Sequence, residues 1–268
     1  METLLGMETL LGMETLPSME TLPDTERRIR FSLSDTSSVI KSMCGENFSL
    51  RAELFDSDSY LDQVIEKPWG HEYRIYADQF YDLWKLSILP EQMTSMHCHP
   101  RKETALLCLA GQGKMQFLEG MCLIKPLDYI YIGKGVFHST ENSSDVPLEL
   151  VEVEVPRNKL DLVRLADKYG RSGKCYETKC LDCSLYTLHH GQLVPGSKIR
   201  KACLYNAYRF EVRAGMDILC RPIDKMLFIV PLSVNNAIEH QIQVLPTTTF
   251  DQQKLLLDEM YFIISKNK

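Results

Sequence analysis

Three histidines between residues 97 and 138 are the side chains of this sequence best suited to chemistry. His97 and His99 flank Cys98, and His138 lies further along the chain. Side chains two residues apart on a β-strand project from the same face. An extended segment would therefore place the two imidazoles together and turn Cys98 away. We expect His97, His99 and His138 to bind one divalent metal ion, because imidazoles with a carboxylate form a common metal site.

The segments between and around the histidines have the pattern of short strands. Apolar or alternating runs separated by turn residues occupy 82–89, 104–109, 114–118, 121–124 and 129–132. Glu119-Gly120 is expected to form a two-residue hairpin turn. Residues 148–155 alternate Leu or Val with Glu and predict a half-exposed strand. Short strands at this spacing indicate an all-β barrel or sandwich.

Composition narrows the class of protein. The chain has 268 residues, a net charge of −6 and 44% hydrophobic residues, enough for a substantial core. An acidic balance excludes the basic patch typical of nucleic-acid binding, and no apolar run is long enough to span a membrane. Nine cysteines, an odd number, with no signal peptide favour reduced thiols and a cytoplasmic location.

The ends of the chain differ from the middle. Residues 1–24 are four copies of a six-residue unit beginning with Met, and residues 1–30 are expected to be a disordered tail, with a short interaction helix as the alternative. Residues 31–63 form a lead-in segment with one short helix. Residues 64–172 are the predicted barrel, and its part from 157 to 171 is expected to be a short helix or an irregular strap. Residues 173–268 are a β-rich extension or a degenerate second barrel without a metal.

A second metal site is an alternative in the C-terminal part. Cys180 and Cys183, with Cys175 before them and His189-His190 after, have a loose zinc-like spacing. No second Cys-x-x-Cys accompanies them, so free buried thiols are favoured.

The order of these residues resembles the cupin superfamily, whose first motif runs Gly, His-x-His, Glu, Gly and whose second runs Gly, Pro-x-Gly, His, Asn. Gly135, His138 and Asn142 match the second motif, with Gly133 in place of its proline. In the first motif, Glu91 stands where the opening glycine belongs. Two residues compete for the carboxylate position of this motif. Glu103 has the expected spacing from His99, whereas Thr104 is in register with the following glycine, Gly111.

A narrower resemblance lies upstream. Pro68-Trp69-Gly70, followed by Lys85 and Pro90, looks like the start of the cupin domain of type II mannose-6-phosphate isomerases, which is also the C-terminal domain of mannose-1-phosphate guanylyltransferases. The resemblance implies a cupin jelly roll with a few short helices, in which Lys85 faces the substrate pocket. Trp69 is expected either to close the barrel as a buried plug or to bind ligand.

The resemblance points to a phosphorylated sugar or a nucleotide sugar as substrate, in a polysaccharide precursor pathway, with isomerisation or epimerisation as the reaction. The metal (Zn, Mn, Fe or Ni) would polarise the carbonyl, and Glu103 would be either its fourth ligand or the general base. Lys85 joins Glu103 as a catalytic candidate. Lys85, Arg101 and Lys102 are candidates for binding phosphate, the alternative for each being an ordinary surface charge.

Two other functions remain as alternatives, and the oligomeric state is a further expectation. A non-catalytic sugar-binding or regulatory cupin is favoured by the uncertain carboxylate, and a metal-dependent dioxygenase uses a similar ligand set. Cupin barrels often pair, so a homodimer is expected.

Overall fold

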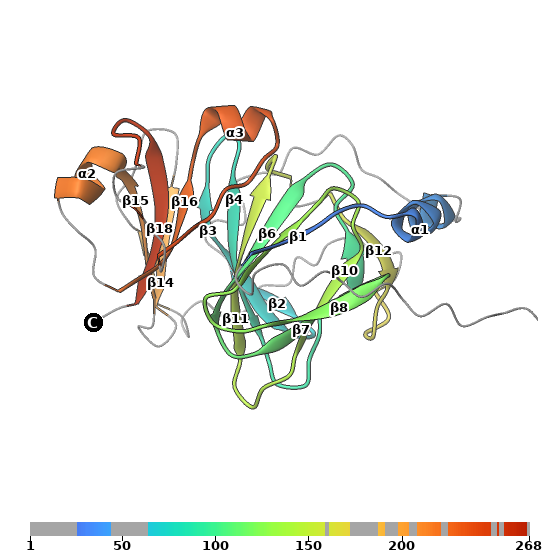
Figure 1. The fold of residues 1–268 in the computed structure, drawn as a ribbon. Coiled ribbons are helices and arrows are strands. Elements are labelled where there is room, and N and C mark those ends of the chain that lie inside the picture. Colours follow the sequence, from blue (N-terminus) through green and yellow to red (C-terminus); the bar gives the residue numbers. More distant parts are fainter. Residues whose placement is uncertain are drawn as a thin grey trace, which may run out of the picture.

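The computed structural model describes residues 26–43, 64–158, 161–171, 187–190, 198–203, 208–220, 225–247, 251 and 255–266. Two sheets in this part of the chain face each other and form a barrel, and a third lies against the outside of the larger one (Figure 1). The fold is a cupin jelly roll with a C-terminal β-rich extension, as predicted. No helix in the described ranges is long and apolar enough to cross a membrane.

The larger sheet has nine strands. Their order is β1 (Glu26–Ile29), β9 (Tyr129–Ile132), β6 (Glu103–Ala110), β11 (Leu148–Val155), β4 (Asp82–Ile88), β3 (Gly70–Ala77), β14 (Lys198–Cys203) and β13 (Thr187–His190), with β2 (Val64–Lys67) paired to β3. The runs expected at 82–89, 104–109 and 129–132 are therefore strands.

The smaller sheet has five strands and carries the histidines. Their order is β12 (Val163–Ala166), β5 (Met96–Cys98), β10 (His138–Asn142), β7 (Gly113–Phe117) and β8 (Gly120–Ile124). Phe117 pairs with Gly120, so the hairpin turn is Leu118-Glu119, one residue earlier than expected. The apolar cluster between the two sheets includes Trp84, Leu106 and Leu150.

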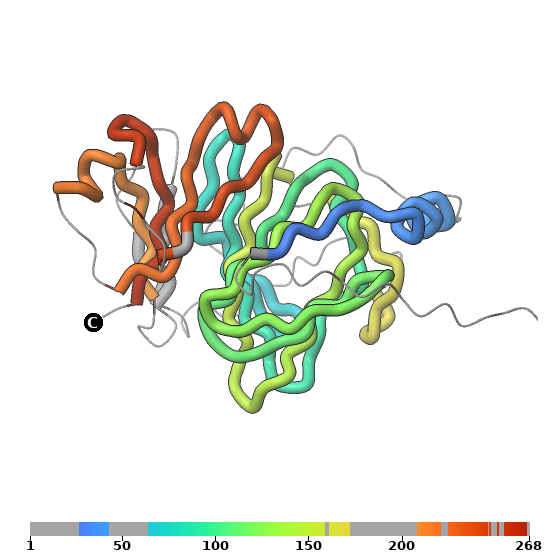
Figure 2. The backbone as a smooth tube through the Cα atoms, in the orientation of Figure 1, coloured from blue at the N-terminus to red at the C-terminus, as the bar shows by residue number. Residues whose placement is uncertain are grey.

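The segment before the barrel is more ordered than predicted. Residues 26–29 are a strand parallel to β9 rather than part of a disordered tail, while the hexapeptide repeats lie outside the described residues. The expected short helix is α1 (Leu33–Met43). Figure 2 follows this segment, in blue, across the barrel to the helix. Asp35 is buried and accepts a hydrogen bond from the backbone of Phe137 at 2.8 Å, which fixes the start of β10 next to His138.

The third sheet covers the outer face of the large one. It consists of β15 (Tyr208–Ala214), β18 (Met260–Lys266), β16 (Met226–Pro231) and β17 (Leu245–Pro246), with α2 (Gly215–Cys220) and α3 (Val234–Ile238) at its margins. One apolar cluster joins Leu107 and Val153 of the barrel to Phe210 and Phe262 of this sheet. The expectation of a half-exposed strand at 148–155 is therefore wrong, because both faces of β11 are covered.

Residues 157–171 were expected to form a helix or strap. Residues 163–166 instead form β12, an edge strand beside β5. The alternating pattern of Val163, Arg164 and Leu165 suits a strand with one face towards the barrel. The candidate zinc ligands Cys175, Cys180 and Cys183 lie outside the described residues. The homodimer and the cytoplasmic location stay predictions.

Backbone conformation explains two positions of the motifs. Gly70 has φ of +144°, and a Cβ there would lie 2.0 Å from the carbonyl oxygen of Ser87, so only glycine fits this hairpin. Glu91, which replaces the opening glycine of the first cupin motif, has φ of +61°. The backbone thus keeps a conformation that favours glycine although the side chain has changed.

Candidate metal centre and substrate pocket

The three histidines meet as predicted from their spacing. His97 lies on β5 and pairs across the sheet with His138 on β10, while His99 follows β5 on the same face. The ring centroid of His97 is 4.5 Å from that of His138 and 5.1 Å from that of His99. Cys98 points to the opposite face and packs with Phe137. One ligand nitrogen from each histidine lies within 4.8 Å of the others, so together they could hold a metal ion.

Backbone carbonyl groups orient all three imidazoles. The Nδ1 atoms donate to the carbonyl oxygens of Ser95, Asp161 and Val136, at 2.7, 2.6 and 3.0 Å from His97, His99 and His138 respectively. Because a carbonyl only accepts, Nδ1 must carry the hydrogen, and Nε2 keeps its lone pair. This is the tautomer that a metal-binding histidine needs.

Burial favours the neutral form of the His99 and His138 rings. It lowers the pKa of His99 well below its ordinary value and that of His138 to about 4, with the nearby charge of Lys102 acting in the same direction. The Nε2 atom of His99 is buried and has no hydrogen-bond partner among the described residues. A buried nitrogen left with an unused lone pair is costly unless a ligand takes it up.

The carboxylate beside the histidines does not come from Glu103. On β6, Ala105 and Leu107 face the outer cluster, and Glu103 shares their face and lies 3.9 Å from Arg28. Thr104 faces inward with Leu106. Neighbouring side chains on a strand point in opposite directions, so Glu103 faces away from the histidines. The expectation that Glu103 is a metal ligand or base is therefore wrong.

Two glutamates of β11 face inward instead. Glu154 pairs in register with Thr104, and Glu152 with Leu106. One ligand atom each from His99, Glu152 and Glu154 lies within 4.8 Å of the others. The side chain of Glu154 is fully buried and accepts from Lys102 Nζ at 2.5 Å. Lys102, considered above as a surface charge or a phosphate ligand, is therefore the buried counterion of Glu154.

Lys85 and Arg101, the other two candidates for binding phosphate, also lie elsewhere than expected. Lys85 lies on the outer face of β4, where its Nζ donates to Glu149 and to the carbonyl of Leu86, and does not line the pocket. Arg101 binds the carboxylate of Asp161 through its backbone N–H and its Nε, both at 2.8 Å. Since the carbonyl of Asp161 holds His99, Arg101 supports the histidine rather than lining the pocket.

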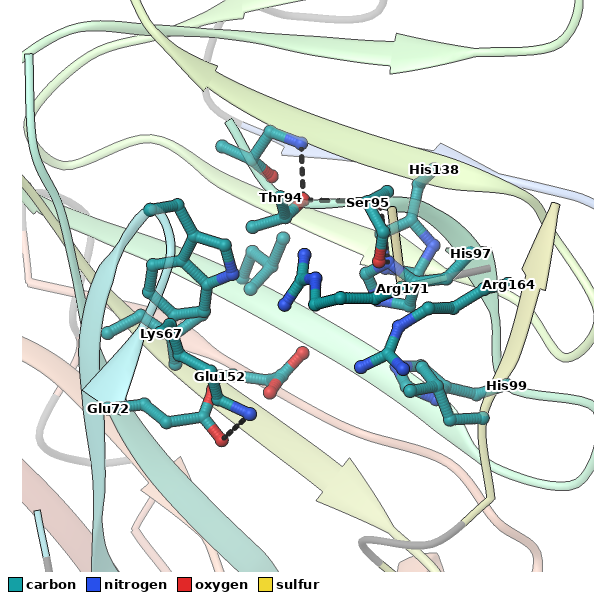
Figure 3. Close-up of a pocket in the computed structure, with 15 residues that line it drawn as sticks. Lys67, Glu72, Thr94, Ser95, His97, His99, His138, Glu152, Arg164 and Arg171 are labelled. Carbon is teal, nitrogen blue, oxygen red and sulfur yellow. Dashed lines mark hydrogen bonds and ion pairs between the residues drawn. The ribbon is translucent and has the colours of Figure 1, made fainter. Parts of the chain in front are cut away.

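An open pocket lies beside the histidines (Figure 3). Apolar walls come from Trp69, Leu86, Leu106 and Leu162. Trp69 thus belongs both to the inner core and to the cavity wall. The two expected roles, a buried plug and a surface that a ligand can contact, are therefore compatible.

Charged side chains of both signs line this cavity. Lys67 and Glu72 form a pair at 3.6 Å, and Glu152 lies near them. Figure 3 shows the guanidinium groups of Arg164 and Arg171 extending into the pocket from the side of the histidines. Arg164 is directly across from His97 in the pairing of β12 with β5. Two guanidinium groups beside a cavity suit an anionic ligand such as phosphate.

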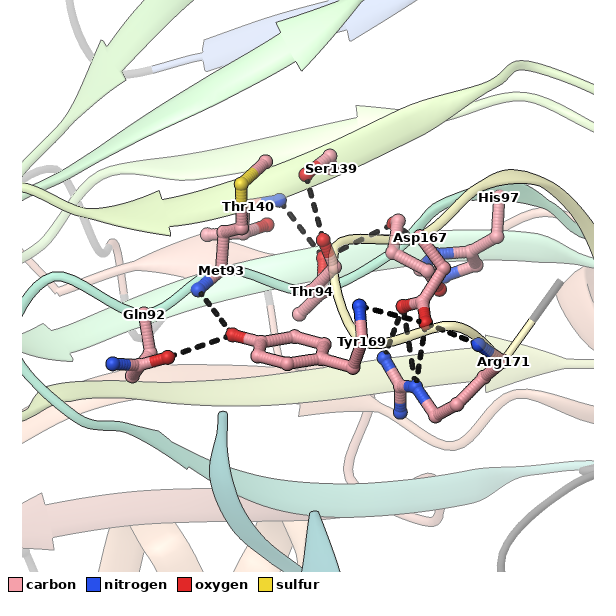
Figure 4. A network of polar contacts seen from close by, with 10 residues as sticks. Gln92, Met93, Thr94, His97, Ser139, Thr140, Asp167, Tyr169 and Arg171 are labelled. Atoms are coloured by element: carbon pink, nitrogen blue, oxygen red, sulfur yellow. Dashed lines mark hydrogen bonds and ion pairs between the residues drawn. The ribbon is translucent and has the colours of Figure 1, made fainter. Parts of the chain in front are cut away.

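Arg171 is fixed by a tight network (Figure 4). The carboxylate of Asp167 accepts hydrogen bonds from Nη2 of Arg171 at 2.6 Å and from the backbone N–H of Arg171 at 2.7 Å. Tyr169 donates to Gln92 at 2.8 Å and accepts from the backbone of Met93 at 3.3 Å. The turn at 167–171 is thereby attached to the loop before β5, and Arg171 is held at the cavity.

Sequence reasoning missed Glu152, Arg164 and Arg171 as pocket residues, and Glu154 as a carboxylate beside His99. The alternation of Glu with Val in β11 is visible in the sequence, but the face that carries the glutamates was expected to point to solvent. The same alternation in 163–165 was read as helical. The alternating pattern is present in both segments, but it does not show whether the polar face points to solvent or into the pocket.

Residues 56–167 match the protein family described as "Mannose-6-phosphate isomerase C-terminal". The chain is similar to mannose-1-phosphate guanylyltransferase of Escherichia coli K12, with 29% identity over 113 residues, which are 41% of this chain and 24% of the relative. It is also similar to the xanthan biosynthesis protein XanB of Xanthomonas campestris pv. campestris, with 26% identity over 118 residues, 43% of this chain and 25% of the relative. The chain thus spans about a quarter of the length of these curated relatives.

Among solved structures, an oxalate decarboxylase of Lactobacillus farciminis in complex with formate is similar, with 22% identity and a TM-score of 0.35, covering 38% of this chain and 33% of that one. The family match at residues 56–167, together with the sheet topology of the described residues within that range, identifies a cupin domain related to the mannose-6-phosphate isomerase C-terminal family. The cupin resemblance noted from the motifs is confirmed for this region.

Proposed function

We propose that this cupin domain binds a divalent metal through His97, His99 and His138 and isomerises or epimerises a phosphorylated sugar or nucleotide sugar. One observation carries the proposal: three Nδ1 atoms are held by carbonyl groups, which leaves three Nε2 atoms beside a cavity containing two guanidinium groups. The family match at residues 56–167 and the guanylyltransferase relatives supply the substrate class.

The donor set fits a borderline divalent ion. Imidazole nitrogens suit Zn²⁺, Mn²⁺, Fe²⁺ or Ni²⁺, and the buried Nε2 of His99 has no hydrogen-bond partner in the described part of the chain. When bound, the ion would polarise the carbonyl of the substrate. The inner face of the barrel would position that carbonyl at the ends of β5 and β10.

Glu152 is the candidate for proton transfer. It lines the cavity, and its side chain comes from β11, opposite Leu106. Isomerisation of an aldose to a ketose moves a proton between neighbouring carbons, which requires a base within hydrogen-bond reach of them. Glu152 takes over the role first assigned to Glu103, whose side chain faces away from the cavity.

Arg164 and Arg171 are the candidates for the phosphate group. Guanidinium groups bind phosphate oxygens in pairs of hydrogen bonds, and the carboxylate of Asp167 already partly neutralises Arg171. Leu86, Leu106 and Leu162 would exclude water from the sugar ring.

The proposal is tested by exchange in deuterated water. The protein, loaded in turn with Mn²⁺, Zn²⁺, Fe²⁺ and Ni²⁺, is incubated with mannose 6-phosphate, a panel of other hexose and heptose phosphates, and GDP-mannose. NMR then follows conversion and deuterium incorporation next to the carbonyl. Metal-dependent exchange that disappears in the His97→Ala, His99→Ala variant is expected. No exchange with any substrate and metal overturns the catalytic proposal.

A non-catalytic sugar-binding cupin is the second candidate, favoured by Thr104 in place of a carboxylate on β6. It predicts saturable binding of one sugar phosphate by calorimetry, without conversion or exchange.

A further inference from the structure

We propose that Glu154, on β11, supplies the carboxylate that Thr104 lacks, so that the metal ligands are three histidines and a glutamate from the neighbouring strand. This inference rests on the metal-binding function proposed above. It assigns a role to a residue outside the sequence segment that contains the cupin motifs.

The first step is the position of Thr104. Thr104 faces inward on β6, is 1% exposed, and has a buried hydroxyl without a hydrogen-bond partner among the described residues. A neutral hydroxyl neutralises none of the charge of a divalent ion. A carboxylate ligand must therefore come from elsewhere if it is present.

The second step is the pairing of the strands. Glu154 is directly opposite Thr104 in the antiparallel pair of β11 and β6. Paired residues point to the same face with Cβ atoms about 4.5–5.5 Å apart. A longer side chain at position 154 can therefore reach the space beside residue 104.

The third step is the distance to the histidine. Oε1 of Glu154 lies 3.9 Å from Nε2 of His99. This separation is too long for a hydrogen bond, but it lies within the span of two metal–ligand bonds of about 2.1 Å each.

The fourth step is the charge of Lys102. Lys102 and Glu154 are both fully buried and paired, because an isolated buried carboxylate would be strongly unfavourable. The ammonium group of Lys102 holds the carboxylate of Glu154 close to the histidines. A bound cation would share this carboxylate with Lys102, so that Lys102 weakens metal binding while making the metal-free protein more stable.

The test measures metal affinity rather than activity. Mn²⁺ binding is followed by calorimetry and electron paramagnetic resonance in the wild type, in Glu154→Gln, and in Glu149→Gln as the control, which carries the same substitution on the outer face of the same strand. We expect Glu154→Gln to weaken Mn²⁺ binding by about 10-fold or more and Glu149→Gln to leave it unchanged.

Two further variants separate a ligand from a structural role. Exchanging the two residues (Thr104→Glu with Glu154→Thr) is expected to restore most of the affinity, because the carboxylate returns on the other strand. Lys102→Met with Glu154→Gln removes both buried charges and serves if the single variant does not fold. It is expected to bind Mn²⁺ more weakly than the wild type, but less weakly than Glu154→Gln, because the unpaired charge of Lys102 no longer repels the ion.

The outcomes distinguish this inference from the proposed function. Wild-type protein that binds no Mn²⁺, Zn²⁺ or Ni²⁺ overturns both. Wild-type binding that is lost in His97→Ala, His99→Ala but kept at full strength without the Glu154 carboxylate overturns the role of Glu154 alone.

Discussion

The carbonyl oxygen of Asp161 accepts a hydrogen bond from Nδ1 of His99 at 2.6 Å, while the carboxylate of the same Asp161 is held by Arg101. A single buried aspartate thus connects the loop before β12 to the metal centre. The orientation of His99 therefore depends on the segment between β11 and β12, which is distant from His99 in the sequence.

Replacing Asp161 with Ala should weaken metal binding without removing a ligand. The lost carboxylate releases the loop from Arg101, so the carbonyl no longer fixes the ring of His99. Supporting residues of this kind typically contribute 10–100-fold to metal affinity, and we expect a Mn²⁺ dissociation constant about 10-fold higher by calorimetry. Asp145→Ala, at an exposed turn, is the control, and equal affinities in both variants would contradict the support role.

Replacing Arg164 with Gln should impair binding of the phosphate group. A hydrogen bond to a charged group contributes about 1.5–3 kcal/mol, so KM for a phosphorylated sugar should rise roughly 10- to 100-fold. Mn²⁺ affinity should not change, because Arg164 is across from His97 but is not a ligand. Arg164→Lys should recover only part of the loss, since Lys lacks the paired donors. An unchanged KM in Arg164→Gln would remove Arg164 from the phosphate site.

Replacing Glu91 with Gly should stabilise the protein. A residue other than glycine at φ of +61° is strained, and relief of this strain exceeds the entropy that glycine loses on folding, by about 1 kcal/mol. Thermal unfolding should show a Tm a few degrees higher. Gln92→Gly, at the next position, is expected to be destabilising, and a lower Tm for Glu91→Gly would refute the strain argument.

His71 should make stability depend on pH. Burial, together with the charge of Lys85, lowers the pKa of His71 from 6.5 to about 4. Between these values the unfolded chain binds the proton and the folded protein does not, so the free energy of unfolding falls as the pH drops from 6.5 towards 4.

The comparison is made with His71→Gln, which cannot titrate. One pKa unit corresponds to about 1.4 kcal/mol, so the loss of stability between pH 7 and pH 4.5 should be roughly 2 kcal/mol smaller in the variant. Urea unfolding at both pH values measures it. His99 and His138 contribute equally to both proteins, and equal pH dependence would show that His71 titrates normally.

The sequence alone determined the central strands of the barrel, although not β1 or β12, and the shared face of His97 and His99. Alternation has a period of two residues, so His97 and His99 had to share a face that excludes Cys98. The motif around His138 placed the third imidazole. Turn residues located the hairpins to within about one residue, as at Leu118-Glu119.

Only the tertiary structure decided which face is inside. Alternation shows that Glu152 and Glu154 share a face, and that Lys85 shares one with Ser87, but it cannot say whether that face meets solvent, another sheet or a cavity. The C-terminal sheet buries the outer face of β4 and β11, so Lys85 is covered without reaching the pocket. The inner face carries the glutamates towards the histidines, because strands far apart in sequence close the barrel around them.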